Sequence, residues 1–237
     1  MTLWLAVFLG LARAEPPRVF KSGPDRVSLL ELYSSEGCSS CPPADEWLSS
    51  LTGAEGLWTD FIPVAFQVDY WDRLGWKDPL SSPEFTARQQ SYANFWQKNS
   101  VYTPGLVLNG KEFRGWGEAP PAKLAEKGGT LAVASDGPLV FAVSYAPSGK
   151  TEKKYIAHAA LLVFGLKSRV AAGENEGKTL RHDFAAVDLE DAALDGGKAR
   201  LRLRKKLALA ANRYGAAFWI TAGDDPTPLQ VVGGYLP

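Results

Sequence analysis

The chain has 237 residues, enough for two ordinary domains or one large one. Hydrophobic residues make up 46% of the sequence and charged residues 22%, a composition that is typical of globular proteins and argues against disorder. The 26 Lys and Arg residues are balanced by 26 Asp and Glu residues, so no basic excess favours nucleic acid or an anionic membrane as a partner.

The N-terminal segment differs in composition from the rest. Residues Leu3–Leu11 are almost all apolar, and the small-x-small pattern of Ala12 to Ala14 follows them. This layout predicts a signal peptide at residues 1–14, followed by a linker at 15–26. A membrane-spanning helix needs about 20 apolar residues, and no run in the chain approaches that length. We therefore expect an exported protein, periplasmic or secreted, with no stable membrane span.

Residues 27–130 are predicted to form an α/β domain of three layers. Apolar runs predict the strands, and Asn109-Gly110 between two strand-like runs predicts a hairpin. A proline near the start predicts each of the first two helices, and Gly128-Gly129 would close the third. The expected order is strand, helix, strand, helix, strand, strand, helix. The elements are expected at Val27–Leu32, Pro43–Leu51, Phe61–Val68, Ser82–Trp96, Leu106–Leu108, Glu112–Arg114 and Ala119–Glu126.

Residues 137–237 are predicted to form a smaller, all-β domain resembling a sandwich. Alternating apolar residues and turns rich in Gly and Asp favour strands, and no long amphipathic helix interrupts them. Residues 200–211 fit either one helix or two strands. The other strands are expected at Leu139–Tyr145, Tyr155–Phe164, Leu180–Val187, Ala199–Leu203, Ala216–Ile220 and Leu229–Val232.

The two cysteines, Cys38 and Cys41, form a C-x-x-C pair just before the first predicted helix. Unpaired N–H groups and the helix dipole stabilise a thiolate there, and the spacing lets the second thiol resolve a mixed disulfide made by the first. We predict thiol–disulfide exchange with Cys38 attacking and Cys41 resolving, with no metal and no cofactor. Two alternatives stay open: a static disulfide, and a Cu(I) site on two thiolates.

Aromatic residues follow the second predicted strand, at the same end of the sheet as the cysteines. Tyr70, Trp71 and Trp76 would form either a hydrophobic rim for a substrate peptide or core packing beneath a long loop. The segment Gly173–Lys178 lacks the glycine spacing of a phosphate-binding loop and predicts a tight connection. His182 follows this segment and could approach the site.

A C-x-x-C between a strand and a helix, with Thr103-Pro104 ahead of the third strand, resembles the thioredoxin superfamily. The resemblance covers about 100 residues and implies that Pro104 is a cis-proline lying against Cys38 and Cys41. It also implies that the backbone of Thr103 pairs with an extended substrate.

This chain departs from thioredoxin at two positions near the cysteines. Gly37 stands where thioredoxin has a tryptophan, and Leu32 stands where thioredoxin keeps a buried acid. Glu31 would replace that acid only with a different strand register.

Four blocks carry a narrower resemblance: Glu31–Asp45; Val68–Asp72 with Leu74–Pro79; Val101–Pro104 with Asn109-Gly110; and Gly173–Asn175 with Gly177–Leu180. Together they are similar to DUF1223, a family of exported bacterial proteins of unknown function. The resemblance implies a thioredoxin-like fold and names no substrate. We expect an exported protein that acts on a protein or peptide disulfide, or alternatively a non-catalytic module that binds a peptide, a partner or Cu(I).

Overall fold

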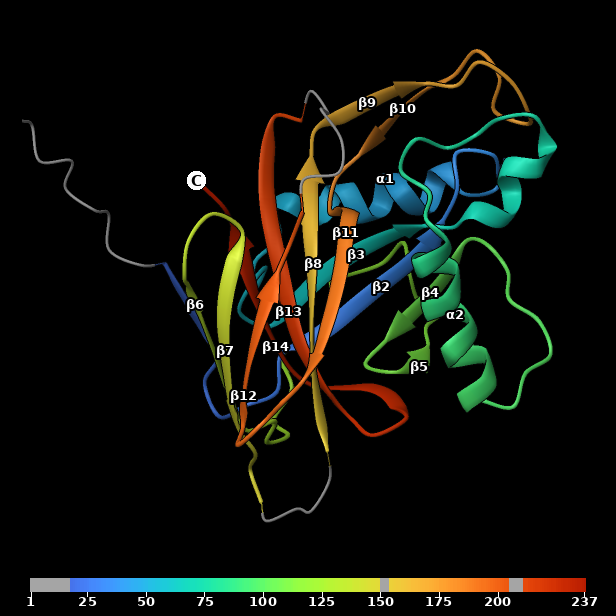
Figure 1. The fold of residues 1–237 in the computed structure, drawn as a ribbon. Coiled ribbons are helices and arrows are strands. Elements are labelled where there is room, and N and C mark those ends of the chain that lie inside the picture. Colours follow the sequence, from blue (N-terminus) through green and yellow to red (C-terminus); the bar gives the residue numbers. More distant parts are fainter. Residues whose placement is uncertain (1–17, 150–153, 205–210) are drawn as a thin grey trace, which may run out of the picture.

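The computed structural model describes residues 18–149, 154–204 and 211–237 (Figure 1). The predicted signal peptide lies outside the described residues, and so do residues 205–210 of the segment left open between helix and strands. The described chain is mostly β-sheet, with two α-helices beside the strands. Among the described residues, no helix combines the length and apolar character that a membrane span needs.

The largest sheet has eight strands in the order β14-β13-β8-β11-β3-β2-β4-β5. They are β14 (Asp225–Tyr235), β13 (Arg213–Ala222), β8 (Tyr155–Phe164), β11 (Ala185–Ala193), β3 (Phe61–Gln67), β2 (Ser28–Ser34), β4 (Gly105–Leu108) and β5 (Lys111–Glu112). A four-stranded sheet has the order β1-β6-β7-β12, with β1 (Val19–Lys21), β6 (Thr130–Ser135), β7 (Val140–Ala146) and β12 (Lys198–Arg202). The hairpin of β9 (Leu166–Arg169) and β10 (Thr179–His182) forms the third sheet.

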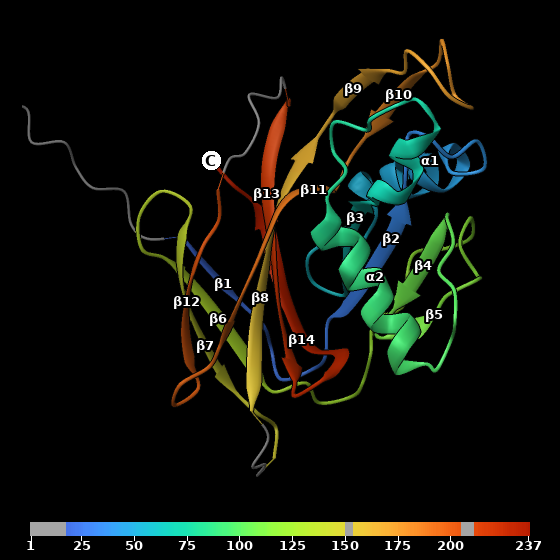
Figure 2. The same cartoon turned by 45° about the vertical axis from the view of Figure 1, so that its right-hand side comes forward.

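The expected elements of the first half are present, apart from the last helix. Helix α1 (Pro42–Ser50) follows β2, and helix α2 (Pro83–Phe95) follows β3. The Ser82 side chain caps α2 by accepting a hydrogen bond from the N–H of Glu84. In the β4–β5 hairpin, Asn109 and Gly110 adopt φ angles of 53° and 82°, the left-handed pair that a type I′ turn requires. Figures 1 and 2 show α2 in front of the strands and α1 behind them.

The helix expected at Ala119–Glu126 is absent, so that prediction was wrong. Pro120 and Pro121 leave too few residues before Gly128 to nucleate a stable helix. The end of the segment instead pairs with the chain that precedes β2, since the N–H of Arg26 donates to Glu126 O at 2.7 Å.

Apart from the β9–β10 hairpin, the strands of the second half do not form a sheet of their own. β11 runs parallel to β3 and joins it at Ala185 and Ala65, where Ala65 N–H donates to Phe184 O at 2.9 Å. Through β11, the strands β8, β13 and β14 extend the sheet begun by β2 and β3. Part of the expected linker also belongs to the fold, since β1 pairs with β6. The expected boundary near residue 137 therefore does not separate two sheets.

The strand expected at Leu180–Val187 is divided in two. Phe184 lies between β10 and β11 with a φ of 57°, outside the extended region, so one ladder cannot run through it. β11 stays in the main sheet, while β10 leaves it to pair with β9. Both views show the resulting hairpin projecting past the sheet and beside α1 (Figures 1 and 2).

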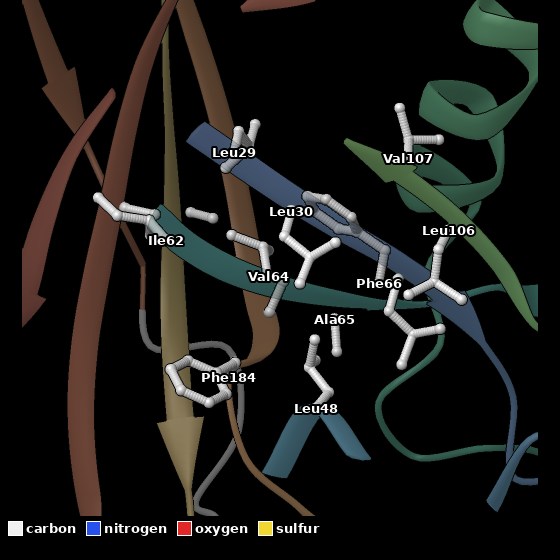
Figure 3. Close-up of a cluster of buried hydrophobic side chains, with 14 of the residues drawn as sticks. Leu29, Leu30, Leu48, Ile62, Val64, Ala65, Phe66, Leu106, Val107 and Phe184 are labelled. Carbon is white, nitrogen blue, oxygen red and sulfur yellow. The ribbon is translucent and has the colours of Figure 1, made fainter. Parts of the chain in front are cut away.

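Two hydrophobic clusters hold these layers together. Alternate residues of β8 divide between them: Leu162 and Phe164 belong to the first, Leu161 and Val163 to the second. The first cluster lies around β2, β3 and the helices, and Figure 3 shows Leu48 of α1 in it. The second lies between the eight-stranded and four-stranded sheets. The sandwich-like packing expected for the second half thus uses strands from a sheet that both halves share.

Candidate functional site

Cys38 and Cys41 lie at the junction of β2 and α1, joined as a disulfide with their Cα atoms 5.5 Å apart. Both are buried, with exposed fractions of 1% and 0%. Ser39 and Ser40, which lie between the two cysteines in the chain, are exposed, and Ser40 Oγ lies 3.3 Å from Cys38 Sγ. A partner at the surface therefore meets the serines before it meets sulfur.

The start of α1 fixes the second cysteine. Cys41 is the N-cap residue, and its carbonyl accepts hydrogen bonds from Ala44 at 2.9 Å and Asp45 at 3.2 Å. Pro42 and Pro43 occupy the first helical positions, where a missing N–H leaves no bond unmade. The pair therefore lies at the positive end of a nine-residue helix, as the sequence predicts.

Trp71 connects the cysteine turn to the Thr103-Pro104 segment. Its Nε1–H donates to Thr103 Oγ1 at 2.8 Å, and the Thr103–Pro104 peptide bond is cis. A Cβ placed at Gly37 would lie only 3.1 Å from Trp71 Cβ. Trp71 can therefore approach the cysteine turn closely because Gly37 has no side chain. Trp71 therefore lies beside Gly37, the position at which the resemblance to thioredoxin implies a tryptophan.

A buried ionic cluster lies beside the cysteine turn. His182 Nε2 lies 2.9 Å from Glu36 Oε1, and Trp76 Nε1–H donates to Glu36 Oε2 at 2.7 Å. Asp78 accepts a hydrogen bond from the backbone N–H of Glu36 at 2.9 Å. The exposed fractions of Glu36, Asp78 and His182 are 1%, 1% and 3%. Three ionisable groups are therefore held away from water next to the pair.

These groups perturb one another. Burial opposes charge on both Glu36 and His182, but their hydrogen bond and mutual attraction outweigh it, so the pKa of Glu36 is lowered and that of His182 is raised. The pair is therefore held in its charged form. Burial, together with the Glu36 carboxylate, raises the pKa of Asp78 to about 7.

Asp45 adds a further acid on the same helix as Cys41, one turn later. Its carboxylate accepts a hydrogen bond from Ser34 Oγ at 2.5 Å. The residue is partly buried, and desolvation of its carboxyl raises the pKa to about 6 despite the opposing attraction of His182. Glu31, which the sequence left open as a replacement for the buried acid of thioredoxin, does not play that part. Its carboxylate is bound to Arg88 of α2 at 2.7 Å.

The loop between β9 and β10 covers the cysteine turn. Asn175 Nδ2 donates to the carbonyl oxygens of Glu36 at 2.9 Å and Cys38 at 2.8 Å. Glu174 accepts a hydrogen bond from the N–H of Ser39 at 2.9 Å, and hydrogen bonds from the side chain and the backbone of Ser39 lower the pKa of Glu174. The segment expected to be only a tight connection therefore binds the backbone on both sides of Cys38.

The structure brings most of the predicted site residues together. Trp71 and Thr103 bond to each other, Trp76 reaches the cysteine turn through Glu36, and Pro104 follows Thr103. Tyr70 is directed toward α2, where its hydroxyl lies 3.2 Å from Gln89 Oε1. Tyr70 and Trp71 also pack against the first hydrophobic cluster, as the core-packing alternative expects.

Sequence reasoning missed five residues of the site: Glu36, Asp45, Asp78, Glu174 and Asn175. All five lie inside the sequence blocks that carry the family resemblance. Membership in these blocks was the signal in the sequence that could have identified them. Their proximity to the cysteines depends on the fold, which brings the hairpin tip over the turn.

The described residues hold no group of three or more His, Cys, Asp and Glu side chains that could bind a metal ion. The cysteine sulfurs are bonded to each other, so neither is available as a thiolate ligand in this state.

One comparison with known proteins identifies a family, and another finds similar structures. The model of a family described as "Protein of unknown function (DUF1223)" matches residues 29–221. A crystal structure of a protein from Agrobacterium tumefaciens aligns with a TM-score of 0.59 and 25% identity, covering 90% of this chain and 96% of that one. HBP35 of Porphyromonas gingivalis aligns with a TM-score of 0.57 and 10% identity, over 91% of this chain and 76% of that one, and shows a similar fold alone. No curated protein matches the sequence.

Proposed function

Because the chain belongs to the DUF1223 family, whose name assigns no activity, we propose a function from the site itself. The protein is an exported, thioredoxin-like thiol–disulfide exchange protein that acts on a protein or peptide through Cys38 and Cys41. The observation that carries the proposal is the C-x-x-C disulfide at the start of α1, where β2 ends.

The arrangement of strands supports the thioredoxin-like part of the proposal. Part of the large sheet has the order β3-β2-β4-β5, in which β2 is parallel to β3 and antiparallel to β4. β5 pairs antiparallel with β4 through the Asn109-Gly110 turn. Helices lie on both faces of these strands, which makes a three-layer α/β unit within the larger sheet (Figure 2).

The proposed exchange needs no cofactor. A thiolate of the partner attacks Cys38 Sγ, the Cys38–Cys41 bond breaks, and its electron pair leaves on Cys41 Sγ. A second partner thiolate attacks the partner's sulfur in the mixed disulfide and releases Cys38. The partner is oxidised to a disulfide, this protein is reduced to a dithiol, and the two protons come from the partner's thiols. The reverse sequence, starting from the Cys38–Cys41 dithiol, reduces a partner disulfide.

The second candidate function is a structural disulfide in a non-catalytic binding module. The burial of both cysteines favours it, since a sulfur that no partner can reach does not turn over. The two candidates differ in the stability of the bond toward reduction.

The deciding measurement is the reduction potential of the Cys38–Cys41 pair, equilibrated against thiol–disulfide buffers. An exchange protein is expected between about −270 and −120 mV, whereas a structural disulfide lies below about −300 mV. A value in the lower range would contradict the proposal and leave the structural disulfide.

A trapping experiment identifies the attacking sulfur. Cys41→Ser leaves Cys38 without its resolving partner, so mixed disulfides with substrate proteins should accumulate and be detected on non-reducing gels. Cys38→Ser is the matched control, since it also leaves a single thiol, but on the resolving residue. Equal trapping by both variants would contradict the assigned roles.

A further inference from the structure

The loop between β9 and β10, residues 170–178, occupies the approach to Cys38. Asn175, at its tip, is completely buried, with an exposed fraction of 0%. Its side-chain amide spans the carbonyl oxygens of Glu36 and Cys38, and its own oxygen accepts from Lys178 Nζ at 2.8 Å. All hydrogen-bonding groups of this side chain are thus used to hold the loop against the cysteine turn.

Two further contacts surround this one. At the surface, Glu174 accepts from the N–H of Ser39 at 2.9 Å. At the base of the hairpin, His182 forms the buried pair with Glu36. The hairpin is therefore attached to the cysteine turn at its tip and at its stem.

The loop also meets the other side of the site. A Cβ at Gly173 would lie 3.6 Å from Trp76 Cβ and 3.8 Å from Leu74 O, so the loop closes against the segment that carries the predicted aromatic rim. Its own fold is compact, since Gly177 N–H donates to Val170 O at 2.9 Å and Lys178 N–H donates to Asn175 O at 3.1 Å. It can therefore leave as a unit.

We propose that this loop is a cover for the cysteine pair, held closed by Asn175 and Glu174, and that it sets which partners reach Cys38. The proposal rests on the exchange function above and assigns its access control. A partner must take over the groups that the loop releases: the Cys38 carbonyl, which needs a donor, and the Ser39 N–H, which needs an acceptor. An extended peptide backbone supplies both, whereas a small thiol supplies neither.

The exchange step is the one already described and follows opening of the loop. The partner's thiolate attacks Cys38 Sγ and the electron pair leaves on Cys41, so opening adds no oxidant, reductant or proton to the balance. Opening breaks the hydrogen bonds of Asn175 and Glu174. Because only open molecules react, the observed rate constant is that of the open form multiplied by the fraction of molecules that are open.

The test compares reduction of the full chain by a protein dithiol, reduced thioredoxin, and by a small phosphine, tris(carboxyethyl)phosphine. Asn175→Ala removes both donors to the turn and is expected to raise the rate constant with the phosphine about tenfold. Glu174→Gln weakens one exposed contact and is expected to raise it by about threefold. Glu176→Gln, in the same loop with an exposed side chain, is the matched control and should behave like the wild type.

If the loop controls access, its loss should also change how strongly the protein discriminates between the phosphine and the protein dithiol. The ratio of the rate constant for the phosphine to that for the protein dithiol should rise in Asn175→Ala, because the phosphine cannot replace the contacts of the closed loop and so gains more from their loss than the protein dithiol does. A purely structural role for Asn175 would lower the melting temperature and leave this ratio unchanged. Glu174→Gln keeps the test valid if Asn175→Ala does not fold.

The outcomes separate the two proposals. If folded Asn175→Ala and Glu174→Gln both react with the phosphine at the wild-type rate, the cover is overturned while exchange can still stand. If neither variant nor the wild type reacts with thioredoxin, but both variants react faster with the phosphine, the cover stands and the exchange function fails.

Discussion

At the scale of single residues, Asp45 is the acid whose titration has the clearest consequence. Its folded pKa is about 6, above the ordinary 3.8, because desolvation outweighs its hydrogen bond from Ser34. A raised pKa means that the folded state binds the proton more tightly than the unfolded state. The stabilising contribution is therefore complete below about pH 4 and is lost as the pH rises through about 6.

We expect Asp45→Asn to remove this dependence, because the amide oxygen still accepts from Ser34 but does not ionise. Between pH 4 and pH 8 the wild type should lose about 2–3 kcal/mol of unfolding free energy more than the variant. Urea denaturation across this pH range measures it, with Glu46→Gln, an exposed neighbour on α1, as control. Parallel pH profiles for wild type and Asp45→Asn would contradict the assignment.

Local sequence was enough to predict the cysteine pair and Thr103-Pro104, since their chemistry depends on neighbours in the chain. The ion pair between Glu36 and His182 was beyond such reasoning, because 146 residues separate the two partners. It forms only when β10 leaves the main sheet at Phe184, a turn that no glycine or proline marks.

At the scale of elements, a buried cation fixes α2 to the sheet. Arg88 Nε binds Glu31 of β2 at 2.7 Å, with side chains 7% and 0% exposed. Its guanidinium carbon lies 4.7 Å from the centroid of the Trp219 ring of β13, and Tyr92 donates to Glu31 Oε1 at 2.5 Å. One side chain thus connects a helix of the first half to strands from both halves.

Arg88→Met should destabilise the fold by about 3–5 kcal/mol, because it leaves the Glu31 carboxylate buried without its cation. The double variant Arg88→Met/Glu31→Leu removes both charges and should recover much of the loss. Urea unfolding of the two variants tests this at neutral pH. If the double variant loses as much as the single one, packing and not the unpaired charge determines the cost.

The elements that sequence predicted correctly have strong local signals, such as the Ser82 cap and the Asn109-Gly110 turn. The helix expected at 119–126 had only helix-favouring side chains to support it, and pairing with residues 24–26 replaced it. Strand β1 was missed because three residues in a polar segment carry no period of their own.

At the scale of the whole molecule, the two halves share one sheet and one set of buried contacts. Gln230 of β14, completely buried, accepts from the N–H of Val27 at 2.9 Å and donates to the carbonyl oxygens of Asp25 at 2.9 Å and Gly129 at 2.8 Å. The last strand therefore satisfies backbone groups at both ends of the first half. Composition and local periodicity predicted a boundary because they carry no information about which strands pair.

This sharing predicts that residues 18–136 do not fold alone. Without β11, strand β3 becomes an open edge, and without β14 the backbone groups held by Gln230 lose their buried partner. The full chain should unfold in one transition, with coincident curves from far-ultraviolet circular dichroism and tryptophan fluorescence. The fragment should show no cooperative transition and rapid proteolysis. A fragment with a sharp transition and native-like protection would establish instead that the first half is an independent domain, to which the later strands add without being required.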